Sequence, residues 1–228
     1  PEDWAVAGTT GYDFANQIGG VTIDGDQVPA LDEVWRDFTG ETAASFAQVA
    51  WEAKREVLTT SFDGELKRLT RLAGNLIAGK PQARAGEAIG GNAIGAEAIA
   101  GQAVAEAELR EALIGMIAEF PVYRTYIAGR SNSPISPIDR DHVETSMRRA
   151  IERIEAAADL VSVTAAGVRS AILAIGGLLL ADERSSATDF IARFQQLTAP
   201  VTAKGIEDTA IYRWTRLMSV NGVGGDPD

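Results

Sequence analysis

The chain has 228 residues, of which 46% are hydrophobic and 23% are charged, proportions that allow one large globular domain or two small ones. Its formal net charge is -11 and its Lys and Arg residues form no dense cluster, so a nucleic-acid partner is not expected. The chain has no cysteine and one histidine, His142, which excludes disulfides and thiolate metal sites and argues against a zinc site; no cofactor is expected.

Neither a membrane span nor a signal peptide is visible. The most apolar window, 165–181, is interrupted by several glycines and by Arg169, so it falls short of the roughly 20 apolar residues that a span needs. It predicts a buried helix or two. The lack of cysteine is compatible with a cytoplasmic protein. Because the sequence starts at Pro1 without Met and stops in a Gly-Gly-Asp-Pro-Asp run, both ends are expected to be cut.

Helix is predicted for most of the chain. Residues 8–16 predict a glycine-punctuated loop that enters a short helix. Six later stretches also predict helix, five because apolar residues recur at steps of three and four and 165–181 because it is the most apolar window of the chain. They are 29–40, 43–77 (two helices, or one that bends near Gly64), 109–117, 139–154, 165–181 and 187–197.

Three short strands are predicted between these helices. The first is brief, over residues 21–23, and the second is the β-branched and aromatic run 120–127, FPVYRTYI. The third is a strand-like run ending at Lys204 and Gly205, just before two adjacent carboxylates.

Residues 79–107 consist almost entirely of Ala, Gly, Glu and Ile. Such small side chains bury little area, which poorly offsets an ordering entropy of about 1–2 kcal/mol per residue. We expect an inserted spacer that is mobile or loosely helical.

Several stretches resemble those of one enzyme family. They are GTTGYDFAN at 8–16, FPVYRTYI at 120–127, RFQQLTAPVTAKGIEDTAIYRW at 193–214 and NGVGGDPD at 221–228. In this order they look like the maltooligosyl trehalose synthases, a branch of the α-amylase family, and with residues 43–73 the resemblance covers well over half of the chain. Besides the Ala/Gly-rich insertion, the departures from the family pattern fall mostly at packing residues. They are Ala15, Thr202, Ile211, Trp214 and Gly222.

The resemblance implies a (β/α)8 catalytic barrel with long helical excursions and an active site at the carboxyl ends of the strands. The fold class expected for this chain is mainly α: an internal fragment that is chiefly the helical excursion, with one or two short barrel-strand pieces. Residues 1–27 would be a barrel-derived loop with a short helix or strand, 28–119 and 131–198 helical subdomains, 120–130 a barrel-type strand, and 199–228 a barrel-type strand with the active-site loop.

The implied reaction is an intramolecular transglucosylation that turns the reducing-end α-1,4 bond of a maltooligosaccharide into an α,α-1,1 bond. Retaining chemistry uses a carboxylate nucleophile and a carboxyl acid/base around an oxocarbenium-like centre. The resemblance places both of these outside the chain and matches Asp208 to a third carboxylate, which stabilises the transition state. The fragment alone would be inactive, and its partners would be the maltooligosaccharide and the rest of the barrel.

Further site residues are implied around Asp208. Glu207 would accept hydrogen bonds from the sugar, and Lys204 and Arg213 would be either ligand contacts or charge partners of the acidic pair. Three tyrosines would form aromatic walls around the sugar. They are Tyr12, Tyr123 and Tyr126.

Other readings stay open from the sequence. Taken without the family, Glu207 and Asp208 are typical of a helix-starting cap, and strand tyrosines often belong to a core. The parent could be an α-amylase-family hydrolase or a different glucanotransferase. A third possibility is a helical binding or scaffolding module without chemistry. An excised fragment should also expose an apolar patch, through which an artefactual dimer could form.

Overall fold

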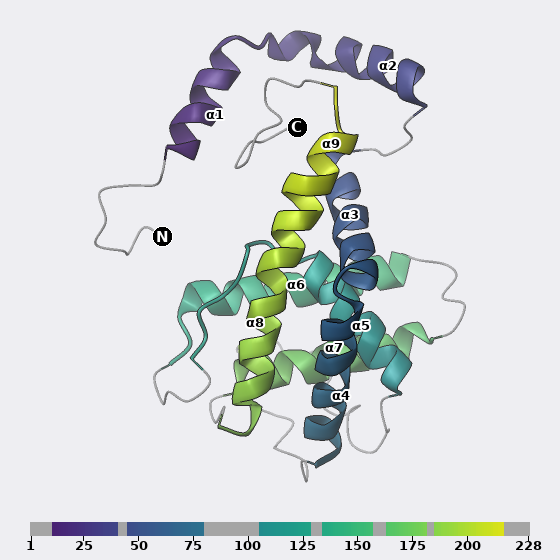
Figure 1. Ribbon diagram of the computed structural model, residues 1–228, viewed down its shortest axis with the longest axis vertical. Helices are drawn as coiled ribbons and strands as arrows, with labels where there is room; N and C mark the ends of the chain where they lie inside the picture. Colours follow the sequence, from purple (N-terminus) through teal and green to yellow (C-terminus); the bar gives the residue numbers. More distant parts are fainter. Residues whose placement is uncertain are drawn as a thin grey trace. The chain divides into compact units, whose positions relative to one another are not determined.

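The computed structural model describes residues 11–40, 45–79, 105–128, 134–156, 163–181 and 185–216. The chain divides into two compact units, and each is described by itself. The smaller unit comprises 1–53 and 204–228, and the larger unit comprises 54–203. The regular structure of the described residues is helical throughout, without a strand (Figure 1). The expectation of a mainly α chain is confirmed.

The larger unit is a bundle of helices around α5 (Glu106–Ala118), which contacts four others (Figure 1). These are α4 (Asp63–Gly79), α6 (Pro137–Ala156), α7 (Ala165–Leu180) and α8 (Thr188–Thr202). All residues from 112 to 118 are buried, because the sequence ALIGMIA is apolar on every side of the helix. The unit also contains the second part of α3 (Phe46–Thr60) and a short 3-10 helix, η2 (Ser185–Ala187).

Helix α7 confirms the buried helix that was predicted from the apolar window. Its Gly176 lies against α6: a Cβ atom added there would come within 2.3 Å of the Met147 sulfur. A side chain at this position would require the Met147 thioether to shift. None of the described helices combines the length and the apolar character that a membrane crossing requires.

The smaller unit contains α1 (Tyr12–Val21), a 3-10 helix η1 (Gly25–Gln27), α2 (Val28–Thr39) and the first part of α3. Its last described helices are a π-helix, η3 (Ala203–Ala210), and a single turn, α9 (Ile211–Arg213). Its core joins residues of α2, α3, η3 and the segment after α9. They are Trp35, Val49, Ala50, Ala53, Ala210 and Trp214.

The boundaries of the early helices follow local signals. Helix α2 has Pro29 in its first turn and ends at Gly40, whose φ of 70° is one that glycine adopts readily. The stretch 43–77 forms two helices, because α3 ends at Thr60 and α4 begins at Asp63. Most of the predicted insertion, residues 80–104, lies outside the described residues.

The predicted strand before the acidic pair is wrong. Helix α8 continues to Thr202 and passes directly into η3, so Lys204 and Gly205 are helical. The physical reason is packing: Phe194, Leu197 and Val201 are buried at helical spacing, so their packing overrides the β preference of the local sequence. The short strand at 21–23 is also wrong, since α1 runs through Val21.

The predicted strand at 120–127 is also absent. This stretch is irregular, and residues 124–128 follow an extended path without a paired strand in the part of the chain that the structure describes. The alternation expected of a strand is nevertheless present, because Thr125 and Ile127 are buried whereas Arg124 and Tyr126 are exposed.

Replacing Thr202 with valine should stabilise the larger unit. Thr202 is 4% exposed, and its hydroxyl has no hydrogen-bond partner among the described residues. A buried hydroxyl that makes no hydrogen bond is unfavourable by roughly 1–3 kcal/mol, and valine has nearly the same shape. We expect the free energy of unfolding in urea to rise by about 1 kcal/mol.

The matched control for this substitution is Thr198→Val, four residues earlier. The hydroxyl of Thr198 is buried but donates to the carbonyl of Gln195 at 3.1 Å, so its loss should lower the free energy of unfolding. Equal losses in both variants would contradict the assignment of an unsatisfied hydroxyl at Thr202.

Candidate functional site

The acidic pair lies inside the π-helix η3. The hydroxyl of Thr209 donates to the carbonyl of Lys204 at 2.9 Å, five residues earlier, and thereby helps to close this wide turn. Turns of this kind are rare and occur frequently at functional sites. Because Glu207 and Asp208 lie within η3 and not at the start of a helix, the structure does not support the reading of a helix-starting cap.

Asp208 is exposed and paired with a lysine. The Asp208 carboxylate lies 3.5 Å from the Lys204 ammonium, and the two side chains are 65% and 54% exposed. Lys204 is therefore a charge partner of Asp208, one of the two roles predicted for it. An exposed pair of this kind contributes about 0–1 kcal/mol, so the carboxylate is only weakly held and can turn to a ligand.

The other two predicted polar residues lie close by along the chain. Glu207 is half-buried, and Arg213 is exposed on α9. Sequence reasoning missed one neighbour: Tyr212 is 74% exposed and follows Asp208 by four residues. A four-residue spacing brings side chains of a helix to neighbouring turns, and this signal could have identified it.

The segment that follows η3 and α9 is anchored in the core of the smaller unit. Trp214 is 1% exposed, and its ring centroid lies 4.7 Å from that of Trp35. The indole N–H of Trp35 donates to the hydroxyl of Thr215 at 3.2 Å. The Arg216 guanidinium, 7% exposed, forms an ion pair of 2.7 Å with Asp32 on α2. These contacts hold the chain just beyond the helix that carries Asp208.

Two of the three predicted tyrosines belong to a different unit from Asp208. Tyr123 and Tyr126 belong to the larger unit, where their exposed fractions are 47% and 61%, so neither is a core residue. The Arg124 guanidinium lies 4.5 Å from the ring centroid of Tyr126, a cation–π geometry that occupies one face of the ring. Tyr12 is the first residue of α1, but its side chain lies outside the described residues.

A buried lysine holds the start of the segment that carries these tyrosines. Lys54 is 6% exposed, and its ammonium donates to the carbonyl of Phe120 at 3.0 Å. Burial lowers the pKa of Lys54 from 10.5 to about 8, against the opposing charge of Glu119 and with a smaller contribution from Arg149.

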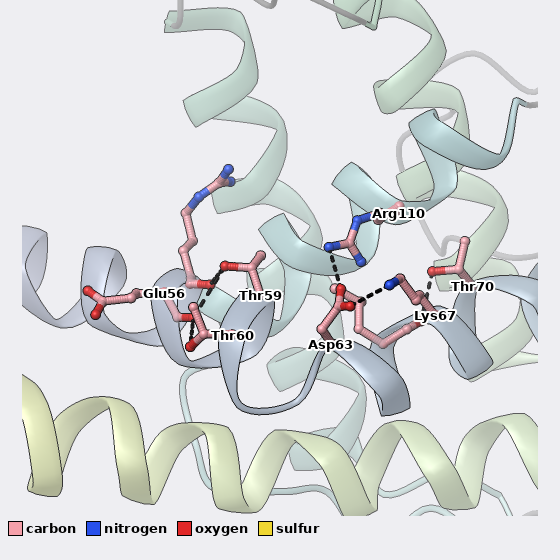
Figure 2. Close-up of polar contacts among 9 residues, drawn as sticks. Glu56, Thr59, Thr60, Asp63, Lys67, Thr70 and Arg110 are labelled. Atoms are coloured by element: carbon pink, nitrogen blue, oxygen red, sulfur yellow. Dashed lines mark hydrogen bonds and ion pairs between the residues drawn. The ribbon is translucent and has the colours of Figure 1, made fainter.

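A second charge cluster joins α4 to α5, as Figure 2 shows. The Asp63 carboxylate lies 2.6 Å from the Lys67 ammonium and 2.8 Å from the Arg110 guanidinium. The hydrogen bond from Lys67 contributes most to lowering the pKa of Asp63, and Arg110 adds to it. Asp63 is the first residue of α4, where a negative charge is favourable, so the cluster has a structural role. Across the described ranges, no group of three or more His, Asp or Glu residues could hold a metal ion.

No protein-family model matches the chain, and no match was found among the curated proteins. The chain is similar to a solved structure of a mutant maltooligosyltrehalose synthase from Arthrobacter ramosus, with 26% sequence identity and a TM-score of 0.68. The match covers 100% of this chain and 23% of that chain. Over its whole length the chain is thus similar to about a quarter of a maltooligosyltrehalose synthase.

Proposed function

We propose that the chain is part of a longer intramolecular transglucosylase, which converts the reducing-end α-1,4 bond of maltooligosaccharides into an α,α-1,1 bond. The observation that carries this proposal is the similarity of the whole chain to part of a maltooligosyltrehalose synthase. In this proposal the described helices are the excursion of a (β/α)8 barrel that the rest of the enzyme forms. The chain alone is not expected to act on maltooligosaccharides.

Asp208 is proposed as the carboxylate of this chain that faces the sugar. Its weak, exposed pairing with Lys204 leaves it able to accept hydrogen bonds from sugar hydroxyls or to stabilise positive charge on the ring. Such stabilisation is strong only where water is excluded, so the rest of the enzyme must cover this side chain. Glu207, Lys204 and Arg213 are proposed as further sugar contacts.

Replacing Asp208 with asparagine tests this role in the longest natural chain that contains the sequence. The amide keeps the shape but removes the charge, so turnover of maltopentaose should fall by about 10²–10³-fold with a modest change in KM. The matched control is Asp189→Asn, which breaks the exposed pair of Asp189 with Arg193 on α8 and should leave turnover unchanged. Near-normal turnover of the Asp208 variant would remove this carboxylate from the mechanism.

Product analysis of the same longer enzyme tests the reaction type. The proposal requires a non-reducing product that retains all glucose units of the substrate. Released reducing sugar as the main product would instead identify a hydrolase of the same family, whereas minor hydrolysis is expected because water can intercept a glycosyl-enzyme.

The exposed apolar side chains favour one alternative, a helical binding module without chemistry. Phe14 and Ile18 on α1 and Val34 and Phe38 on α2 are between 53% and 90% exposed. In a binding module these faces would hold a partner, and Asp208→Asn would have no effect on its function. In a fragment the same faces would cause concentration-dependent dimerisation that disappears in the longer enzyme.

A further inference from the structure

A single buried side chain of α8 holds the extended segment 124–128 in its register. Gln195 is 8% exposed, and its amide faces the backbone of Ile127. The Gln195 carbonyl oxygen accepts from the Ile127 N–H at 2.8 Å and from the Thr125 hydroxyl at 3.1 Å. The Gln195 amide nitrogen donates to the Ile127 carbonyl at 3.1 Å.

This arrangement takes the place of a neighbouring strand, which the segment does not have among the described residues. A side-chain amide offers one acceptor and two donors, so Gln195 satisfies both backbone groups of Ile127, as the peptide group of a paired strand would. Buried backbone groups need such partners, because without them each is unfavourable in an apolar environment. The amide therefore selects Ile127 as the residue that faces the core.

The choice of Ile127 decides which side chains are exposed. Successive residues of an extended segment point to opposite sides, so burial of Thr125 and Ile127 places Arg124 and Tyr126 outside. A slip by one residue would bring the Arg124 guanidinium towards the core, which is strongly unfavourable. Asp139 adds one exposed contact, because its carboxylate accepts from the N–H of Tyr126 at 3.2 Å.

We propose that Gln195 is a positioning residue, which sets the stacked Arg124–Tyr126 pair for contact with a ligand through the backbone of Ile127. The identity of the ligand rests on the proposed function: it is a glucosyl unit of the maltooligosaccharide. Gln195 itself is buried behind the segment and does not touch the ligand.

The test replaces Gln195 with methionine, which keeps the volume and removes both hydrogen-bonding groups. In the 228-residue chain, hydrogen exchange followed by NMR should show that the protection factor of the Ile127 amide falls by about tenfold or more. The matched control is Gln196→Met, the exposed neighbour on the same helix, which should leave this amide unchanged. An unchanged Ile127 amide in the Gln195→Met variant would overturn the proposal.

A second variant, Gln195→Glu, separates positioning from general loss of structure. A protonated carboxyl can accept from the Ile127 N–H and donate to its carbonyl, whereas an ionised one can only accept. Protection of Ile127 in this variant should therefore be close to wild type at about pH 4 and reduced several-fold at pH 8, after correction for intrinsic exchange. Equal protection at both pH values would contradict the role of the amide donor.

The ligand is tested separately in the longer enzyme. Gln195→Met should raise KM for maltopentaose several-fold with a smaller change in kcat, since it disturbs a binding surface and no reacting group. If the wild-type enzyme forms no trehalose-type product, the proposed function fails, while the exchange of Ile127 still decides the positioning role. If the enzyme is active but KM is unchanged, the proposed link between Gln195 and the ligand is wrong.

Discussion

Replacing Trp214 with alanine is expected to lower the free energy of unfolding of the smaller unit by about 3–5 kcal/mol, the usual range for loss of a buried large aromatic side chain. Trp214 is 1% exposed and packs on Trp35, with a further ring contact to Phe46 at 6.4 Å between centroids. The guanidinium of Arg216 also lies 5.4 Å from its ring centroid. Urea denaturation followed by tryptophan fluorescence and by circular dichroism measures the loss.

Two variants control this result. Tyr212→Ala removes an aromatic side chain two residues earlier that is 74% exposed, so it should change stability by less than about 0.5 kcal/mol. Trp214→Tyr should be less damaging than alanine because it retains a ring. A loss below about 1 kcal/mol for Trp214→Ala would show that this residue does not anchor η3.

Raising the pH from 8 to 10.5 is expected to remove an unfavourable contribution of the Lys54 charge to the free energy of unfolding. The pKa of Lys54 is about 8 in the folded chain and 10.5 in the reference state, so the unfolded state binds more protons between these values and stability rises with pH. The difference of 10.5 minus about 8 is roughly 2.5 pKa units, or about 3 kcal/mol at 1.36 kcal/mol per unit. This penalty is fully present below pH 8.

The measurement compares wild type with Lys54→Met across this pH range. Other groups titrate in the same range, so the diagnostic quantity is the difference in unfolding free energy between the two proteins. We expect the free energy of unfolding of wild type to rise, relative to that of the variant, by up to about 3 kcal/mol between pH 8 and 10.5. Lys67→Met, at an ammonium side chain that is 66% exposed, should show no such gain. A constant difference between wild type and Lys54→Met would show that folding does not lower the pKa of Lys54.

The helices could be predicted from the sequence because their apolar residues recur at helical spacing or, in α7, form one apolar window. The structure confirms this for α2, α3, α4, α5, α6 and α7. The failures fall where local preference and packing disagree. Pro200 and Val201 are poor helix formers, but the buried face of α8 continues through them. FPVYRTYI has strand composition, yet it accepts from Lys54, donates to Asp139 and pairs with Gln195, which are side chains of distant helices.

The Lys204–Asp208 pair of the candidate site could be predicted from the sequence, but the role of Gln195 could not. The pairing of Lys204 with Asp208 could be expected from a four-residue spacing along the chain, and the structure shows it. Gln195 could not be found in this way, because it lies 68 residues from Ile127 and an amide on a helix has no local signature. Only the fold brings these two groups together.

The fit of Met147 over Gly176 also has a chemical consequence. Oxidation of a methionine adds a polar oxygen to the sulfur, and in the α6–α7 contact this sulfur packs so closely on Gly176 that an added atom requires the thioether to shift. Because Met147 is 5% exposed, peroxide reaches its sulfur mainly when the two helices separate, and the sulfoxide then hinders their return. The extent of oxidation of Met147 over time would therefore depend on how often α6 and α7 separate.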